Sequence, residues 1–180
     1  MSHSLPGTPA DDLTPQEALK ELERLKSRIR LPKADDAKPA TIHVTSDRDP
    51  KCFVIMSFGR ADLEVVFEDF VRPVLVNDCK LICRRGDDIF GSGAIIDDVR
   101  KAIAECDLAV ADLTGQNANV FYELGICHTL GKPVLMLAQS KEDIPFDVRH
   151  LRVLLYEYTP RGCKTLEKAI KAHIDTMLVR

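Results

Sequence analysis

Short runs made almost entirely of apolar residues recur from residue 52 onward in this 180-residue chain. Clear examples are CFVIMSF at 52–58, LAVADLT at 108–114 and KPVLMLAQ at 132–139, and the more polar KLICRRG at 80–86 and RVLLYEY at 152–158 resemble them. A strand covered on only one face alternates apolar and polar residues, and these runs do not alternate. They therefore predict strands of a parallel sheet that is covered on both faces.

Segments in which apolar residues recur at helical spacing separate these runs. They are 63–78, 93–107, 119–131 and 163–178. In the second segment the spacing predicts that Ile95, Ile96, Val99 and Ile103 face the core. In the first, Pro73 predicts a kink. Strands that alternate with helices indicate an α/β fold, so we expect a flavodoxin-like three-layer sandwich with a five-stranded parallel sheet of order 2-1-3-4-5. A permuted strand order stays open.

The first part of the chain has a different texture. Thr14 is typical of an N-cap, Pro15 stands at the first helical position, and Glu17 completes a capping box. We expect an N-terminal extension at 1–50, with a helix at about 14–30 and a linker at 32–50, and one domain at 51–180. The helix either packs on its own domain or serves for self-association.

Composition narrows the function classes. The chain is 45% apolar and 29% charged with a net charge of −3, so it has no electrostatic basis for non-specific binding of nucleic acid or acidic membranes. No apolar run approaches the roughly 20 residues of a membrane span, and the first residues lack the apolar core of a signal peptide. We expect a cytoplasmic protein. The six cysteines lack two pairs at zinc-site spacing, so we expect no metal site and no cofactor.

Polar residues gather where the predicted strands end. In a parallel sheet these carboxyl ends share one edge, where ligands bind. The carboxylates and amides there are Asp87, Asp88, Asp97, Asp98, Asp112, Asn117, Asn119 and Glu123. Such groups suit ligands rich in hydroxyls, since carboxylates accept hydrogen bonds and amides both donate and accept. The chain has no GxGxxG after the first strand and no GxxxxGK[ST], which argues against a dinucleotide site of Rossmann type and against a P-loop.

Glu123 differs from the other acids because apolar residues surround it on both sides in the sequence. Phe121, Tyr122, Leu124 and Ile126 make a fully solvated position implausible. A buried glutamate beside an oxocarbenium-like centre acts as nucleophile or charge stabiliser in glycosidic cleavage. Asp97 and Asp98, by contrast, are explained as first-turn helix acids favoured by the helix dipole.

The segments CFVIMSFG, RRGDDI, CDLAVADLTGQNANVFYELGICHTLGKPV and PFDVRHLRV together resemble the nucleoside 2-deoxyribosyltransferase-like superfamily, in particular the bacterial branch that borders TIR-like domains. The resemblance covers about residues 51–158. It implies a flavodoxin-like fold and cleavage of an N-glycosidic bond, with Glu123 as nucleophile. It also implies that Asp112, Asn117 and Asn119 line the sugar and base pocket and that the loop 56–59 covers the base.

These arguments give one set of candidate residues. The candidate catalytic residues are Glu123 and Asp112, and the candidate substrate-binding residues are Met56, Ser57, Phe58, Gly59, Arg84, Asp87, Asp88, Asp98, Asn117 and Asn119. Arg84 and Arg85, near the end of the second strand, indicate a phosphate on the ligand, because arginine binds phosphate in a bidentate manner, and ordinary surface arginines explain them equally well.

The function we expect is cleavage or transfer of the N-glycosidic bond of a nucleoside or nucleotide. Two alternatives stay open. One is a TIR-like NAD-cleaving domain activated by self-association through the helix at 14–30. The other is a non-catalytic module that binds a nucleotide signal or a partner protein. Since members of the resembled family share active sites between subunits, we expect a homodimer or a larger homo-oligomer.

Overall fold

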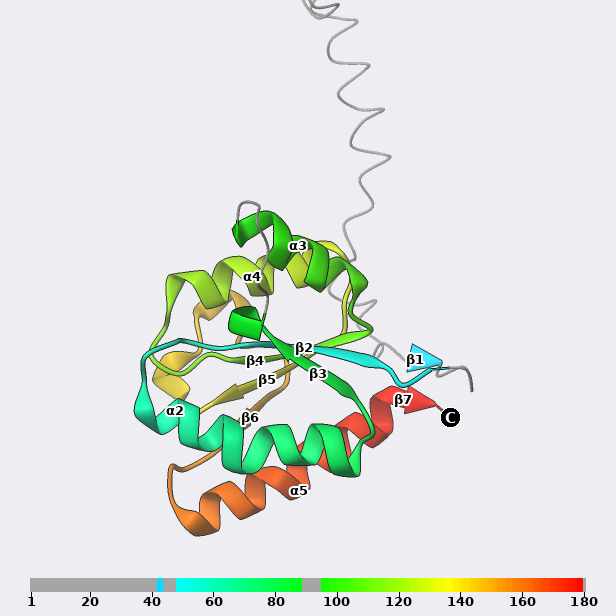
Figure 1. Cartoon of the computed structure of the whole chain (residues 1–180). Helices are drawn as coiled ribbons and strands as arrows, with labels where there is room; N and C mark the ends of the chain where they lie inside the picture. Colours follow the sequence, from blue (N-terminus) through cyan, green and yellow to red (C-terminus); the bar gives the residue numbers. More distant parts are fainter. Residues whose placement is uncertain (1–41, 44–47, 89–94, 180) are drawn as a thin grey trace, which may run out of the picture. The chain divides into compact units, whose positions relative to one another are not determined.

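A computed structural model describes residues 42–43, 48–88 and 95–179 of the chain, and the helix expected at 14–30 lies outside them. A five-stranded, all-parallel sheet forms the centre of the described unit (Figure 1). Its strands are β2 (Lys51–Ile55), β3 (Ile82–Arg85), β4 (Leu108–Asp112), β5 (Val134–Ala138) and β6 (Val153–Leu155). The spatial order is β3-β2-β4-β5-β6, which is the predicted 2-1-3-4-5 when the strands of this sheet are counted along the chain.

Helices cover both faces of this sheet and complete the three layers (Figure 1). On one face lie α3 (Ile95–Glu105) and α4 (Ala118–Thr129). On the other lie α2 (Ala61–Val66), two π-helical segments, η2 (Phe67–Val71) and η3 (Val74–Asp78), and α5 (Pro160–Met177). None of the helices in the described residues is long and apolar enough to cross a membrane.

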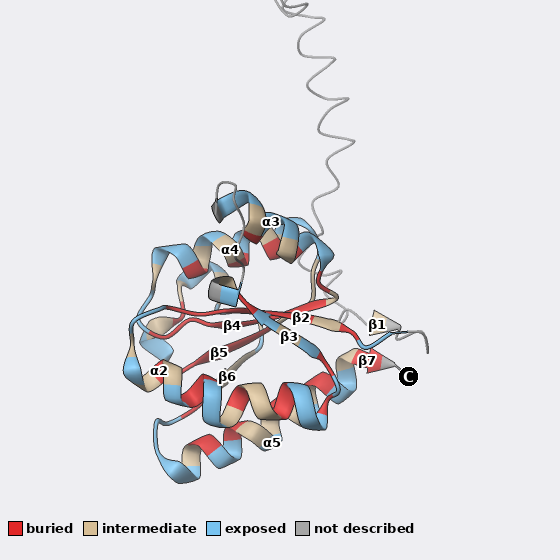
Figure 2. Ribbon diagram, in the orientation of Figure 1, coloured by how far each residue is buried: buried red, intermediate tan, exposed pale blue. Residues whose placement is uncertain are grey.

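The side chains of β4 show why the apolar runs do not alternate. Leu108 and Val110 belong to the core under α2 and α5, whereas Ala109 and Ala111 belong to the core under α3 and α4. All five residues of this strand are buried, and the central strands β2, β4 and β5 are mainly buried in Figure 2, unlike the edge strands β3 and β6. Because helices cover both faces of the sheet and exclude water from them, both faces require apolar side chains. The period of two is therefore present in the structure but hidden in the sequence.

The helix expected at 63–78 continues through Pro73, but it changes type on both sides of this residue. The π-helical segments η2 and η3 flank this proline, and the N–H of Cys79 donates to the carbonyl of Val74, five residues earlier, at 2.9 Å. Proline has no N–H to donate, so the regular ladder cannot continue through it, and the backbone widens locally. The predicted kink is therefore a change of helix type.

Of the linker expected at 32–50, the structure describes residues 42–43 and 48–50, and these take part in the folded unit. Ile42–His43 forms the short strand β1, which pairs in parallel with β7 (Leu178–Val179) at the end of the chain. Ile42 packs against the core under α5, and both guanidinium nitrogens of Arg48 donate to Asp107 at 2.7 Å. The proline content and charge of this stretch indicated a linker, and the structure corrects that interpretation for these positions.

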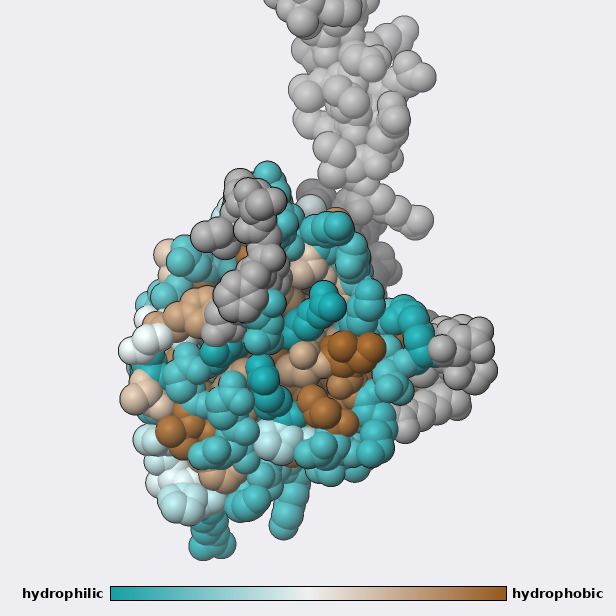
Figure 3. Space-filling view, viewed as in Figure 1, coloured by the Kyte–Doolittle hydropathy of each residue, from teal (hydrophilic) through white to brown (hydrophobic). Residues whose placement is uncertain are grey.

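The sheet has two open edges among the described residues. β3 is one of them, and the side chain of its first residue, Ile82, is 43% exposed. Figure 3 shows apolar side chains reaching the surface between charged ones on the face where this edge lies. β6, with three residues, is the other edge.

Candidate functional site

A cavity of about 450 Å³ opens near the carboxyl ends of β2 and β3, between the loops that follow them and the helices α3 and α4. Six of the residues predicted from the sequence line it: Met56, Ser57, Phe58, Asn117, Asn119 and Glu123. Segments that are distant in the sequence therefore meet at one place. Their side chains supply one carboxylate, one hydroxyl, two amides and an aromatic ring.

The start of α4 is fixed by a single side chain. Asn117 is its N-cap, and its Oδ1 accepts a hydrogen bond from the backbone N–H of Asn119 at 2.9 Å. Its Nδ2 donates to Ser57 Oγ at 3.1 Å. Since Asn117 holds the helix start with one end and the loop after β2 with the other, it links the two walls of the cavity. An N-cap of this kind stabilises a helix by about 1 kcal/mol.

A left-handed turn brings the chain from β4 to this cap. Gly115 and Gln116 have φ of +80° and +53°. A side chain on Gly115 would collide with the guanidinium of Arg60. The positive φ is therefore what favours glycine in the DLTGQN turn, and an added Cβ would in addition displace the flexible end of the Arg60 side chain.

Glu123 lies in the second turn of α4 and is half-buried in the cavity. Within residues 48–88 and 95–179, no hydrogen bond or ion pair engages its carboxylate. Burial raises its pKa from 4.5 to about 7. Water is partly excluded, and no cationic side chain in the described part of the chain pairs with the carboxylate to offset the loss of hydration, so the ionised form is disfavoured. A positive charge that developed next to this carboxylate would be strongly stabilised.

Asp112, the second candidate catalytic residue, does not line this cavity. It follows Val110 on the side of β4 that faces α2 and α5, where it is 7% exposed. Its Oδ1 accepts from the backbone N–H of Thr114 at 3.0 Å, and its Oδ2 accepts from the Tyr156 hydroxyl at 2.7 Å. Burial raises its pKa, and these two hydrogen bonds oppose the rise. The structure thus places Asp112 in a network that joins β4 to the residue following β6.

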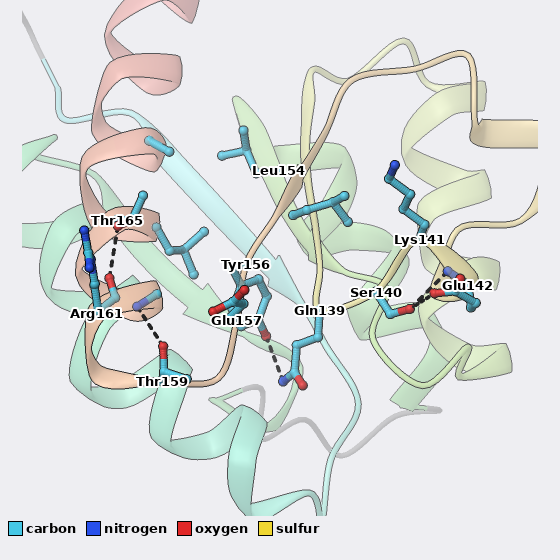
Figure 4. A pocket seen from close by; sticks show the side chains of 14 residues that line it. Gln139, Ser140, Lys141, Glu142, Leu154, Tyr156, Glu157, Thr159, Arg161 and Thr165 are labelled. Carbon is cyan, nitrogen blue, oxygen red and sulfur yellow. Dashed lines mark hydrogen bonds between the residues drawn. The ribbon is translucent and has the colours of Figure 1, made fainter.

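That network borders a second, larger cavity of about 630 Å³ (Figure 4). Gln139 and Tyr156 line it, and Gln139 Nε2 donates to the Tyr156 hydroxyl at 3.3 Å. The opposite wall comes from the first turns of α5, including Arg161 and Thr165. No residue predicted from the sequence lies among its lining residues.

Four other candidates lie away from the Glu123 cavity, and one has an undescribed side chain. Arg84 is exposed on the edge strand β3, and Asp98 is half-buried in the first turn of α3. Asp88 is exposed and accepts hydrogen bonds from the backbone N–H of Arg85 at 2.9 Å and from Arg72 at 3.3 Å. Gly59 has φ of +77° in the loop after β2 but is not a lining residue. The side chain of Asp87 lies outside the described part.

Sequence reasoning missed five residues that line the cavity. They are Gly86, Ile96, Val99, Val120 and Tyr122. Helical spacing contained a signal for one of them, because Asn119, Tyr122 and Glu123 lie at i, i+3 and i+4 on one face of α4. Ile96 was expected in the core, but it is 38% exposed and lines the cavity, whereas Val99 and Ile103 are buried as predicted. Ile96 thus lies at the opening, and the side chain of Ile95, also expected in the core, lies outside the described part.

Each aromatic ring of the cavity has an arginine against it. The guanidinium of Arg85 lies 5.4 Å from the ring centre of Phe58. That of Arg100 lies 5.9 Å from the ring of Tyr122, whose hydroxyl accepts a 2.5 Å hydrogen bond from Arg100 Nη2. Arg85 is 8% exposed, whereas Arg100 is exposed. The sequence indicated both Arg84 and Arg85 as possible phosphate-binding residues and placed only Arg84 among the site candidates, whereas Arg85 is the one that is buried.

No group of three or more His, Cys, Asp and Glu side chains in the described residues is arranged to hold a metal ion.

Comparisons with known proteins give structural matches only. No protein-family model matches the chain, and no curated protein matches its sequence. Among solved structures, a 2-deoxyribosyltransferase from Bacillus psychrosaccharolyticus is 16% identical, with a TM-score of 0.50 over 65% of this chain and 90% of its own. A CMP N-glycosidase from Clostridium botulinum is also 16% identical, with a TM-score of 0.50 over 66% of this chain and 98% of its own.

A 2-deoxyribosyltransferase from Leishmania mexicana is 20% identical, with a TM-score of 0.43, and the match spans 51% of this chain and 65% of that protein. The two matches with a TM-score of 0.50 show a shared fold. Because their sequence identity is only 16%, the activity must be argued from the site. The chain has the α/β fold found in a 2-deoxyribosyltransferase and in a CMP N-glycosidase, in agreement with the resemblance of its sequence to the nucleoside 2-deoxyribosyltransferase-like superfamily.

Proposed function

We propose that this chain cleaves or transfers the N-glycosidic bond of a nucleoside or nucleotide in the cavity around Glu123. The observation that carries the proposal is the half-buried carboxylate of Glu123, which has no ionic partner within residues 48–88 and 95–179. A structural glutamate in such a place is normally paired, because an unpaired buried charge destabilises the fold. An unpaired one fits a reaction in which the substrate supplies the positive charge.

The reaction follows from that charge. As the bond between the anomeric carbon and the base nitrogen breaks, its electron pair leaves with the base, which takes up a proton. The sugar becomes oxocarbenium-like, and a Glu123 carboxylate oxygen forms an ester bond to the anomeric carbon. A water molecule or a second base then attacks this carbon, the ester bond breaks, and the carboxylate is regenerated. Water gives the free sugar, and a base gives a new nucleoside.

The other lining residues provide groups that a nucleoside can use. The side-chain amide of Asn119 both donates and accepts hydrogen bonds, which suits ribose hydroxyls or a base edge. Phe58 and Tyr122 are aromatic and 54% and 47% exposed, so they offer surfaces for a planar base. Ser57 Oγ already accepts from Asn117, which leaves its hydroxyl proton for a ligand acceptor.

The structural relatives support the same class of substrate. One is described as a 2-deoxyribosyltransferase and another as a CMP N-glycosidase, so one transfers a deoxyribosyl group and the other cleaves the glycosidic bond of a nucleotide. Both reactions involve the same type of bond. The shared fold supports this chemistry as the starting hypothesis for the present chain.

The test is direct assay of released base. The full chain is incubated with deoxynucleosides, nucleosides, their 5′-monophosphates and NAD, and free base is separated by chromatography. Glu123→Gln removes the nucleophile and keeps the shape, and Glu105→Gln changes an exposed glutamate of α3 as a matched control. We expect base from the wild type and from Glu105→Gln, and loss of at least about a hundredfold in Glu123→Gln.

Equal product from the wild type and Glu123→Gln would contradict the role of this residue. Absence of free base with every substrate, together with a rise in melting temperature on addition of a nucleotide, would instead indicate a non-catalytic nucleotide-binding module. Release of nicotinamide from NAD alone would move the proposal to NAD cleavage. Each result therefore separates one function from the others.

A further inference from the structure

The guanidinium of Arg85 lies between two aromatic rings. Its central carbon is 5.4 Å from the ring centre of Phe58 and 4.9 Å from that of Phe67. Arg85 is the last residue of β3 and is 8% exposed, although it carries a full charge. A guanidinium desolvated against aromatic faces interacts favourably with the negative faces of both rings.

Contacts with Glu64, Met56 and Asp88 hold Arg85 in place. Its Nη1 donates to Glu64 Oε2 at 2.5 Å and approaches Met56 Sδ at 3.8 Å. Its backbone N–H donates to Asp88 at 2.9 Å. Glu64 and Phe67 belong to the helical layer that covers the sheet, so the guanidinium plane is fixed by the folded core. The charge of Arg85 is paired with Glu64, so its role need not be recognition of a ligand phosphate.

Phe58, by contrast, is an exposed residue. It follows β2 in a loop, it is 54% exposed, and the next residue, Gly59, has φ of +77°. Among the described residues it belongs to neither hydrophobic core cluster. Its close neighbours are Arg85 and Gly86, where an added Cβ would lie 3.4 Å from the Phe58 ring. Within residues 48–88 and 95–179, the guanidinium of Arg85 is the charged group that packs against this exposed ring.

We propose that Arg85 is a positioning residue that holds the Phe58 ring at the wall of the Glu123 cavity, where the ring stacks on the base of the substrate. The inference rests on the proposed function, since it takes the ligand to contain a base. Stacking of a base on an aromatic side chain contributes much less binding free energy if the ring must first be ordered, because ordering costs conformational entropy. Arg85 removes that cost by ordering the ring before the ligand arrives.

A double-mutant cycle tests the coupling. The variants are Arg85→Met, Phe58→Ala and the combination, assayed for base release. Each single change should raise KM about tenfold and leave kcat within about twofold, because stacking acts on binding. The combination should be no worse than Phe58→Ala alone, because Arg85 has nothing left to position. If the Arg85→Met effect persists at full size without the Phe58 ring, the proposal is wrong.

Arg72 provides the matched control. Its guanidinium also lies 4.9 Å from the Phe67 ring, but it has no ring contact with Phe58. Arg72→Met should therefore leave KM unchanged, and a tenfold rise there would contradict the assignment to Arg85. If thermal unfolding shows that Arg85→Met is not folded, Glu64→Gln serves in its place, because it weakens the contact that holds the guanidinium without removing the arginine. This change should raise KM in the wild type and have no effect without the Phe58 ring.

Ligand binding separates this inference from the proposed function. Calorimetry of the same variants with a nucleoside 5′-monophosphate and with NAD gives dissociation constants without turnover. Binding with the same non-additive pattern but no base release would overturn the proposed function and support the role of Arg85. Turnover with additive effects would do the opposite. If none of these ligands binds and none is turned over, both the proposed function and the role of Arg85 are overturned.

Discussion

Replacing Glu123 by glutamine should stabilise the protein at alkaline pH and leave its stability nearly unchanged in acid. Burial raises the pKa of this carboxyl from 4.5 to about 7, so the folded protein binds the proton more tightly than the unfolded chain does. Between these two values the folded state holds more protons, and stability must fall as pH rises. The ionised carboxylate of Glu123 therefore lowers the free energy of unfolding by its full amount above about pH 7, and the protonated carboxyl has no such effect well below pH 4.5.

The size of the effect follows from the same values. Each pKa unit corresponds to about 1.4 kcal/mol, so the rise from 4.5 to about 7 sets an upper limit of about 3 kcal/mol. Glu123 is only half-buried, and solvent screening reduces this to about 1–2 kcal/mol. Glutamine has nearly the same shape and no charge, so Glu123→Gln should be more stable than the wild type by this amount above about pH 8.

Urea unfolding of the wild type, Glu123→Gln and the control Glu105→Gln at several pH values between about 5 and 9 measures the difference. The advantage of Glu123→Gln should grow as pH rises toward 7 and then level off, whereas that of the exposed control should not grow. If the difference in free energy of unfolding between Glu123→Gln and the wild type stayed constant or shrank with rising pH, the reasoning would be refuted. The variant that gains stability should also be the one that loses base release, since functional charges are often held at a cost in stability.

Further expectations concern activity and the scaffold. Base release should fall as pH drops through about 7, because the nucleophile must be ionised, and kcat/KM against pH measures this. Tyr156→Phe removes the hydroxyl that donates to Asp112 and should cost about 1–3 kcal/mol in urea unfolding, with base release preserved. Asn117→Ala should cost about 1 kcal/mol through the lost N-cap and also reduce base release, whereas Asn117→Asp should restore the stability. Gly162→Ala should lower the melting temperature because its Cβ would collide with a backbone oxygen, and Gly125→Ala, on an exposed open position of α4, should stabilise by about 0.5–1 kcal/mol.

Much of the fold was predictable because its elements are local. Five short apolar runs separated by helical segments allow few arrangements other than a parallel sheet with two covered faces. Two features of the fold differ from the prediction, one for a local reason and one for a long-range reason. Pro73 widens the helix around it, and Ile42–His43 gains a partner strand from the far end of the chain. A pairing of two residues is too short to give a sequence signal.

The candidate site was predictable to the extent that one block of sequence builds it. The cap at Asn117, the amide of Asn119 and the carboxylate of Glu123 belong to one turn and one helix, so their spacing already places them together. The aromatic lining residue Tyr122 follows from the same helical period. Residues on α3 could be added only once α3 was known to pack beside α4.

The sequence by itself therefore determined the set of strands and helices and the edge of the sheet that carries polar residues. It also pointed to Glu123 as the candidate nucleophile. Only the tertiary structure decided which neighbours share a face. Asp112 points to the side of α2 and α5, away from Glu123, and Arg85 rather than Arg84 is buried. Successive strand residues point to opposite faces, and a strand that is apolar on both faces bears no mark of which is which. That information exists only when the helices are packed on the sheet.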